Sequence, residues 1–265
     1  MTPSRETPNP NTSSDAAWFT ITTPKQQADM RLFCFPYAGG NITLFHNWSR
    51  QLPGSVEVCA AQLPGRGNRM RETPFTSLRP LVESLGEAIG PLLQKPFAFF
   101  GHSMGALIAF ELTRYLRREK GLSPRHLFVS GRRAPHVPKR ESPIHDLPQP
   151  EFIEELRRLD GTPSEVLEHP ELMELMIPLL RADFAMVDTY EYVPEPPLEC
   201  GITAYGGLQD HEVDRESLEA WRDCTQGRFI LRMLPGGHFF PRSDQEMLLR
   251  LLNTELHQIV MRASS

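Results

Sequence analysis

Residues 101–105 read Gly-His-Ser-Met-Gly, a G-x-S-x-G arrangement that can carry a nucleophilic serine. The pentapeptide follows the apolar run Phe97–Phe100 and opens a helical pattern that begins at Ala106. A strand, a tight turn and a helix are the setting that such a serine requires, because the turn presents the hydroxyl at the end of the strand. The flanking glycines leave room where backbone segments approach closely. We therefore predict that Ser103 attacks an acyl carbonyl.

A serine hydroxyl needs a base at neutral pH, and histidine commonly serves. Of the histidines far beyond Ser103, His257 falls on the last helical pattern, and His211 comes too early for the final loop. His238 follows the last apolar run on a glycine-rich turn that can present an imidazole at the end of a sheet. We predict that His238 is the base.

The third member of such a triad is a carboxylate that orients the imidazole and stabilises its charged form. Asp210 and Asp214 both follow the apolar run Ile202–Gly206. We favour Asp210, which lies closer to the end of that run. Asp214 is the rival candidate and is interpreted as part of the loop leading to the next helix.

The elements around these residues alternate between short apolar runs and longer helical patterns. The runs are Leu32–Phe35, Val56–Gln62, Phe97–Phe100, Leu127–Ser130, Ile202–Gly206 and Phe229–Met233. The helical patterns between and after them are Thr76–Leu93, Ala106–Lys120, Arg215–Thr225 and Asp244–Val260. Strands that are apolar on consecutive residues are covered on both faces. This alternation predicts an α/β fold in which a mostly parallel central sheet has helices on both faces. With the serine turn, it indicates the α/β-hydrolase fold.

A developing oxyanion needs backbone N–H donors. In this fold one donor follows the nucleophile, which here is Met104, and the other comes from the loop after an early strand. Phe35–Gly40 is that loop, and its glycines allow the backbone to turn toward a ligand.

One stretch interrupts the alternation. From about 136 to 194 we find only helical patterns, at Glu151–Leu159, Pro163–Glu168 and Leu172–Tyr190. An insertion between two parallel strands lies near the carboxyl ends of the strands, where ligands bind in open α/β sheets. We interpret it as a helical lid; a purely stabilising insertion is the alternative.

The ends and the composition limit the remaining possibilities. Residues 1–15 are polar and rich in Pro, Ser and Thr, so we expect a disordered tail followed by a single domain over 16–265. The net charge of -5 argues against a nucleic-acid binder. We see no signal peptide or membrane span and expect a cytoplasmic protein. The cysteines are widely spaced without a C-x-x-C pair, which disfavours a metal site: Cys34, Cys59, Cys200 and Cys224.

Five sequence blocks together resemble the type II thioesterases, the free-standing enzymes that accompany modular polyketide and non-ribosomal peptide synthetases. The blocks are F-P-Y-A-G-G at 35–40, L-P-G-R at 63–66, G-H-S-M-G-A at 101–106, R-A-D-F at 181–184 and P-G-G-H-F-F at 235–240. They occur in order from about Arg31 to the last helix. The vertebrate medium-chain acyl carrier protein hydrolase is similar in the same blocks.

The resemblance implies a triad of Ser103, Asp210 and His238, with backbone oxyanion donors at Ala38 and Met104. Tyr37 and Phe239 become candidate substrate contacts. The implied substrates are acyl groups on the phosphopantetheine arm of acyl or peptidyl carrier proteins, and the implied role is removal of aberrant or stalled chains. The resemblance calls for neither cofactor nor metal, and we expect a monomer, which gel filtration can test.

Three alternatives stay open: a medium-chain acyl carrier protein hydrolase that terminates fatty acid synthesis, a general carboxylesterase or lipase, and a non-catalytic binding protein with this fold.

Four other residues are interpreted as structural or surface residues without a role in catalysis. We interpret His102 as packing beside the nucleophile and Arg66 as fixing a loop by hydrogen bonds. Arg132 and Arg133 are interpreted as a solvated basic face, with contact to an acidic carrier protein or the pantetheine phosphate as the alternative.

Overall fold

The computed structural model describes residues 18–139, 141–162 and 164–263. Among these residues, seven strands form one sheet in the order β1-β3-β2-β4-β5-β6-β7. All neighbouring strands are parallel except β1, which pairs antiparallel with β3. The strands are β1 (Phe19–Thr20), β2 (Met30–Phe35), β3 (Val56–Ala61), β4 (Phe97–His102), β5 (His126–Ser130), β6 (Gly201–Gly207) and β7 (Phe229–Leu234). The predicted tail at 1–15 lies outside the described residues.

The helices follow the strands as the alternation predicted. They are α1 (Trp48–Gln51), α2 (Leu78–Ile89), α3 (Met104–Lys120), α4 (Gln149–Leu159), α5 (Ser164–Leu167), α6 (Pro170–Asp188), α7 (Arg215–Glu219), α8 (Phe240–Ser243) and α9 (Gln245–Ala263). Short 3-10 helices complete the set: η2 (Ile42–Phe45), η3 (Gly67–Arg69), η4 (Gly90–Leu92) and η5 (Ala220–Cys224). All six apolar runs are strands, so the predicted fold class is confirmed.

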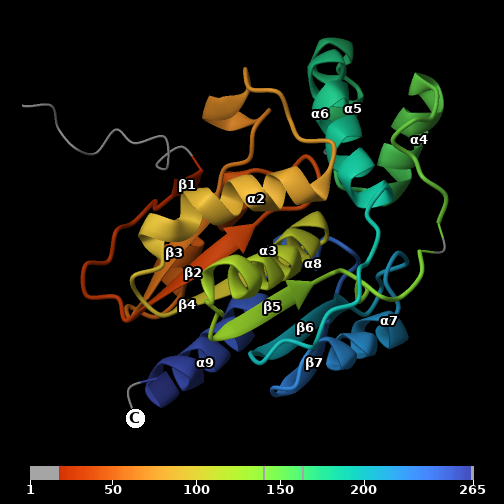
Figure 1. Cartoon of the computed structure of the whole chain (residues 1–265). Coiled ribbons are helices and arrows are strands. Elements are labelled where there is room, and N and C mark those ends of the chain that lie inside the picture. The colour runs from red at the N-terminus through yellow and green to blue at the C-terminus, as the bar shows by residue number, and fades with distance from the viewer. Residues whose placement is uncertain (1–17, 140, 163, 264–265) are drawn as a thin grey trace, which may run out of the picture.

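The two faces of the sheet belong to separate hydrophobic cores. On β2, Phe33 and Phe35 pack into the core that α2 and α3 cover, whereas Leu32 and Cys34 face the core of α1 and α9. Figure 1 shows α2 and α3 crossing one face of the sheet and α9 lying behind it. Burying one such phenylalanine contributes about 1.5–3 kcal/mol. Coverage on both faces explains why the inner strands are apolar on consecutive residues.

The interrupting stretch contains α4, α5 and α6 and no strand among its described residues. In Figure 1 the three helices group together, apart from the helices that cover the sheet. They have a small core of their own: Phe152, Leu156, Met173, Ile177 and Leu180. The predicted helical insertion is therefore present, and its role as a lid stays a prediction.

No helix in the described part of the chain has the length and hydrophobicity needed to span a bilayer.

Candidate active site

Ser103 lies in the turn between β4 and α3, at φ 54° and ψ −113°. Its N–H donates to the Ser130 carbonyl over 2.7 Å, which ties the turn to the end of β5. A Cβ on Gly101 would lie 2.1 Å from the Gly105 carbonyl oxygen, and one on Gly105 would lie 2.1 Å from the Phe35 oxygen. Real Cβ atoms do not approach that closely, so both positions require glycine. A positive φ at a non-glycine residue is strained and is often found at active sites.

His238 and Asp210 form the second part of the site. His238 Nδ1 lies 2.8 Å from Asp210 Oδ2, and the Asp210 side chain is 0% exposed against 14% for His238. The other carboxylate oxygen, Oδ1, accepts the N–H groups of Glu212 (2.8 Å) and Val213 (3.1 Å). Asp210 is thereby fixed in one orientation, which fixes in turn the imidazole it contacts.

The loops that carry this pair are joined to each other. The N–H of Gln209, after β6, donates to the Gly236 carbonyl over 2.9 Å, and the N–H of Leu208 donates to the Leu234 carbonyl over 2.8 Å. A Cβ on Gly207 would lie 2.4 Å from the Gly237 oxygen. Two parallel neighbours, β6 and β7, therefore deliver the acid and the imidazole to one point.

Asp214, the rival acid, has a different role in the fold. It is the N-cap of α7, and its side chain accepts the Ser217 N–H over 2.8 Å. Asp210 alone of the two lies against His238. His257, the histidine set aside on the last helix, is exposed.

Ser103 and His238 line the same cavity, of about 130 Å³. Among the described residues no hydrogen bond joins their side chains, so proton transfer between them requires that bond to form when substrate binds. Tyr37 and Phe239 line the cavity too, and their ring centroids lie 5.0 Å apart. The insertion contributes apolar side chains to the wall: Leu156, Leu159, Leu180, Phe184 and Val187.

Ala38 and Met104 lie on this cavity as well. No hydrogen-bond acceptor among the described residues takes the backbone N–H of either. The loop that carries Ala38 packs on the start of α3, as the close approach of Gly105 to the Phe35 oxygen shows. Two unused N–H donors on the cavity of a serine are what a developing oxyanion requires.

His102 packs beside His238, with ring centroids 5.2 Å apart. It is fully buried, and its Nδ1 lies 3.0 Å from Ser130 Oγ. Burial lowers the pKa of His102 well below its usual range, and the charge of His238 lowers it further. His102 is therefore held in its neutral form.

The interpretation of Arg132 and Arg133 as a solvated face is wrong, because both are partly buried and line the cavity. Arg133 pairs with Glu141. The Arg132 guanidinium makes no hydrogen bond or ion pair with a described residue, and burial, with the charge of Arg133, lowers the pKa of Arg132 to about 10. Its carbonyl accepts the Trp221 indole N–H over 2.7 Å, so the backbone that presents the guanidinium is fixed.

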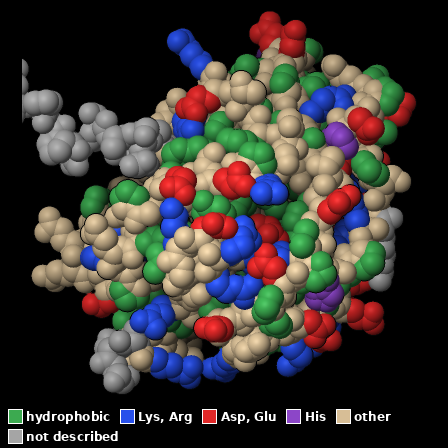
Figure 2. Space-filling view, in the orientation of Figure 1, with side chains coloured by type: hydrophobic (Ala, Val, Ile, Leu, Met, Phe, Trp, Pro, Cys, Tyr) green, Lys and Arg blue, Asp and Glu red, His purple; other side chains and the backbone are tan. Residues whose placement is uncertain are grey.

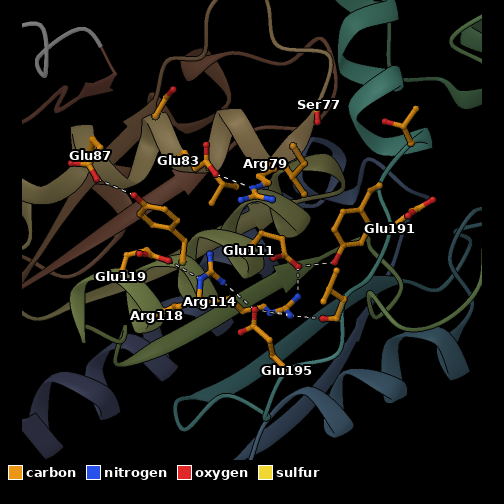
Figure 3. A pocket seen from close by; sticks show the side chains of 17 residues that line it. Ser77, Arg79, Glu83, Glu87, Glu111, Arg114, Arg118, Glu119, Glu191 and Glu195 are labelled. Atoms are coloured by element: carbon orange, nitrogen blue, oxygen red, sulfur yellow. Dashed lines mark hydrogen bonds and ion pairs between the residues drawn. The ribbon is translucent and has the colours of Figure 1, made fainter.

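A larger groove, of about 900 Å³, lies elsewhere, between α2, α3 and the chain after α6. Figure 2 shows acidic and basic side chains gathered over α2 and α3, and Figure 3 shows them at close range. Six glutamates and three arginines line the groove, and some of them pair: Arg114 contacts Glu111 (2.6 Å) and Glu195 (3.0 Å). Neither Ser103 nor His238 lines this groove, so it is not the catalytic site.

One buried ion pair beside the site was not foreseen from the sequence. Arg66, 4% exposed, contacts Asp183, 0% exposed, over 2.7 Å. Arg66 also donates to the Gly40 carbonyl over 3.0 Å, which confirms its predicted role in fixing a loop. The sequence signal at Asp183 is its place in the R-A-D-F block at 181–184, which does not name its partner.

Comparison with known proteins places this geometry in a family. The thioesterase domain family matches residues 30–256. Gramicidin S biosynthesis protein GrsT from Aneurinibacillus migulanus is 46% identical over 92% of this chain and 95% of its own length. Among solved structures, RedJ, the thioesterase from the prodiginine biosynthetic pathway of Streptomyces coelicolor, is 41% identical with a TM-score of 0.79, covering 88% of this chain and 92% of that chain.

The type II thioesterase BorB from the borrelidin biosynthetic cluster has 35% identity and a TM-score of 0.83, covering 94% of this chain and all of that chain. The family match extends from β2 to the last helix, so it includes every cavity residue named above. The chain therefore belongs to the thioesterase domain family: it is a thioester hydrolase with the α/β-hydrolase fold, and it stands among the type II thioesterases.

Proposed function

We propose that Ser103, His238 and Asp210 hydrolyse acyl thioesters on the phosphopantetheine arm of carrier proteins. The observation that carries the assignment is the His238–Asp210 contact of 2.8 Å at the cavity that Ser103 also lines. The strained φ of Ser103 and the unused N–H groups of Ala38 and Met104 support it.

In the proposed mechanism, His238 removes the Ser103 proton while the serine oxygen attacks the thioester carbonyl. The N–H groups of Ala38 and Met104 hold the oxyanion, and collapse of the adduct breaks the C–S bond; the pantetheine sulfur leaves with the proton that His238 took from the serine. Water, deprotonated by the neutral His238, then attacks the acyl-serine, and the imidazolium returns that proton to the serine oxygen as the acid is released. Asp210 keeps the imidazole oriented and stabilises its protonated form.

We further propose an editing role, in which the enzyme clears stalled acyl groups from a polyketide or peptide synthetase. The similarity to a gramicidin S biosynthesis protein and to the type II thioesterase of the borrelidin cluster supports this role. The competing assignment is chain termination in fatty acid synthesis. Rates against carrier proteins loaded with C2 to C12 acyl groups separate the two: editing predicts a shallow profile, whereas a sharp optimum at medium chains would contradict it.

The insertion should set which acyl chains fit. Leu156 of α4 is 2% exposed and lines the cavity. Leu156→Trp is expected to lower the rate for the longest chains of that panel at least tenfold and to spare C2, because the indole fills space that a long chain needs. Leu175→Trp, on the exposed face of α6, is the matched control. An unchanged profile for the Leu156 variant would make the insertion a stabilising element only.

Arg132 offers a second test of the substrate class. A partly buried guanidinium that lines the cavity and has no partner among the described residues is suited to the phosphate of the pantetheine arm. We expect Arg132→Gln to raise the KM for acyl-phosphopantetheine about tenfold or more, the effect of one lost charged hydrogen bond, and to leave acyl-pantetheine unaffected. Arg133→Gln, whose parent arginine already has a partner, is the control. Equal losses on both substrates would exclude the phosphate as the ligand of Arg132.

A further inference from the structure

The oxyanion loop is attached to the insertion by the Arg66–Asp183 pair. Asp183 of α6 accepts Arg66 Nη2 on Oδ1 (2.7 Å) and Arg66 Nη1 on Oδ2 (2.9 Å). The same Oδ2 accepts the backbone N–H of Gly39 over 2.7 Å. Arg66 Nη1 also donates to the Gly40 carbonyl over 3.0 Å. The carboxylate and the guanidinium thus hold two peptide groups of one turn.

Two N–H groups of the turn are held by acceptors. The N–H of Gly40 donates to the Tyr37 carbonyl over 2.9 Å, and the N–H of Gly39 goes to Asp183. Gly39 has φ +75°, and a Cβ on it would lie 2.6 Å from Leu180 Cδ2 of α6, so the loop and the helix are in close contact. The N–H groups of Tyr37 and Ala38 have no acceptor among the described residues, and both residues line the cavity. The Ala38 N–H belongs to the peptide group whose carbonyl, that of Tyr37, is held by the Gly40 N–H.

Arg66 is also held by hydrogen bonds within its own loop, which follows β3. Gln62 Nε2 donates to the Arg66 carbonyl over 2.6 Å, and Arg66 Nε donates to the Pro64 carbonyl over 3.4 Å. The loop after β3 therefore holds the arginine, the arginine holds Asp183, and Asp183 holds the oxyanion loop.

We propose that Arg66 and Asp183 are positioning residues that aim the Ala38 N–H at the oxyanion. This proposal rests on the proposed function of the cavity. Neither side chain lines the cavity, so both act through the turn at 37–40. The same contacts make the adjoining part of α6 a fixed support of the active site, so any motion of the insertion must leave this segment in place.

The alternative is a pair that only stabilises the fold, and a double variant separates the two. Arg66→Met with Asp183→Leu removes both charges together, which avoids leaving one of them buried and unpaired. It leaves the Gly39 N–H without its acceptor. We expect this variant to fold, to keep its KM for an acyl-carrier protein within threefold, and to lose about 10²-fold in kcat, the cost of a misplaced donor. A kcat within threefold of the unmodified enzyme would overturn the proposal.

A matched control is the Arg31–Glu57 pair, 2.8 Å apart, with exposures of 16% and 6%, near the amino ends of β2 and β3. Arg31→Met with Glu57→Leu removes a comparable pair far from the turn and should keep kcat. If the Arg66 and Asp183 double variant does not fold, Asp183→Asn replaces it. This substitution keeps the shape of the side chain, and we expect a tenfold lower kcat at constant KM, whereas an unchanged kcat would overturn the proposal.

Labelling of Ser103 by a fluorophosphonate tests the positioning role of Arg66 and Asp183 independently of whether the enzyme hydrolyses thioesters. The phosphonyl oxygen occupies the oxyanion position, so no thioester is needed. We expect the double variant to be labelled about 10²-fold more slowly than the unmodified enzyme and the Arg31 and Glu57 control. Labelling at the unmodified rate would overturn the positioning role, even for an enzyme that hydrolyses no carrier-bound thioester.

Discussion

Ser103→Ala is expected to abolish thioester hydrolysis and to leave the fold intact. Without the hydroxyl no acyl-enzyme forms, and loss of a nucleophile of this kind costs on the order of 10⁵-fold or more in kcat. The cavity, the His238–Asp210 contact and the N–H donors do not depend on the serine oxygen. Release of free thiol from an acyl-carrier protein measures the loss directly.

The control for this variant is Ser49→Ala. Ser49 is a buried serine of α1 that does not line the cavity, and its hydroxyl has no hydrogen-bond partner among the described residues. Both variants should unfold within about 3 °C of the unmodified enzyme, since 1 kcal/mol shifts the Tm of a chain of this size by about that much. Residual turnover by the Ser103 variant within 100-fold of the unmodified rate would remove Ser103 from the mechanism.

Asp210→Asn is expected to lower kcat by about 10⁴-fold, the cost seen when an orienting carboxylate of a triad becomes an amide. The amide can donate to the imidazole Nδ1 and so favour the wrong tautomer. It also withdraws the charge that stabilises the protonated ring. A hydrolysis assay against the same acyl-carrier protein measures the change.

Asp214→Asn provides the comparison within one loop. Asp214 caps α7, and asparagine is an equally good N-cap, so stability and kcat should both stay near their original values. If instead the Asp214 variant lost activity and the Asp210 variant kept it, the acid of the triad would be Asp214.

Much of the fold could be predicted because its signals are local. The inner strands are buried on both faces, and this makes them apolar runs that can be recognised in sequence. β1, with two residues, is too short to give such a signal. The elbow glycines could be recognised because their spacing around Ser103 reflects a close packing that recurs in this fold.

The site could be predicted in part, because some of its residues have local sequence signals and others do not. His238 follows from chain order and a glycine-rich turn, whereas Asp210 and Asp214 differ by four positions and both follow the same strand. In sequence, only its closeness to the strand end favours Asp210, and the contact with His238 depends on how the loops after β6 and β7 are cross-linked. The Arg66–Asp183 pair joins residues 117 apart through the placement of α6, and nothing local records such a contact. The burial of Arg132 depends on the packing of the insertion in the same way.

The loops that line the cavity all follow the carboxyl ends of strands. Loops after β2, β4, β5, β6 and β7 each contribute to the cavity, and ligands bind at this edge in open α/β sheets. Because the loops share hydrogen bonds, a change in one should reach its neighbours.

Capture of the acyl-enzyme tests most directly whether Ser103 is the nucleophile. An acyl-carrier protein is mixed with the enzyme and quenched in acid within milliseconds, and the enzyme is then measured by intact and peptide mass spectrometry. We expect a mass increase of one acyl group, located on the peptide that contains Ser103 and absent from the Ser103→Ala variant. An acyl group on any other residue, or hydrolysis that still proceeds in that variant, would contradict this assignment.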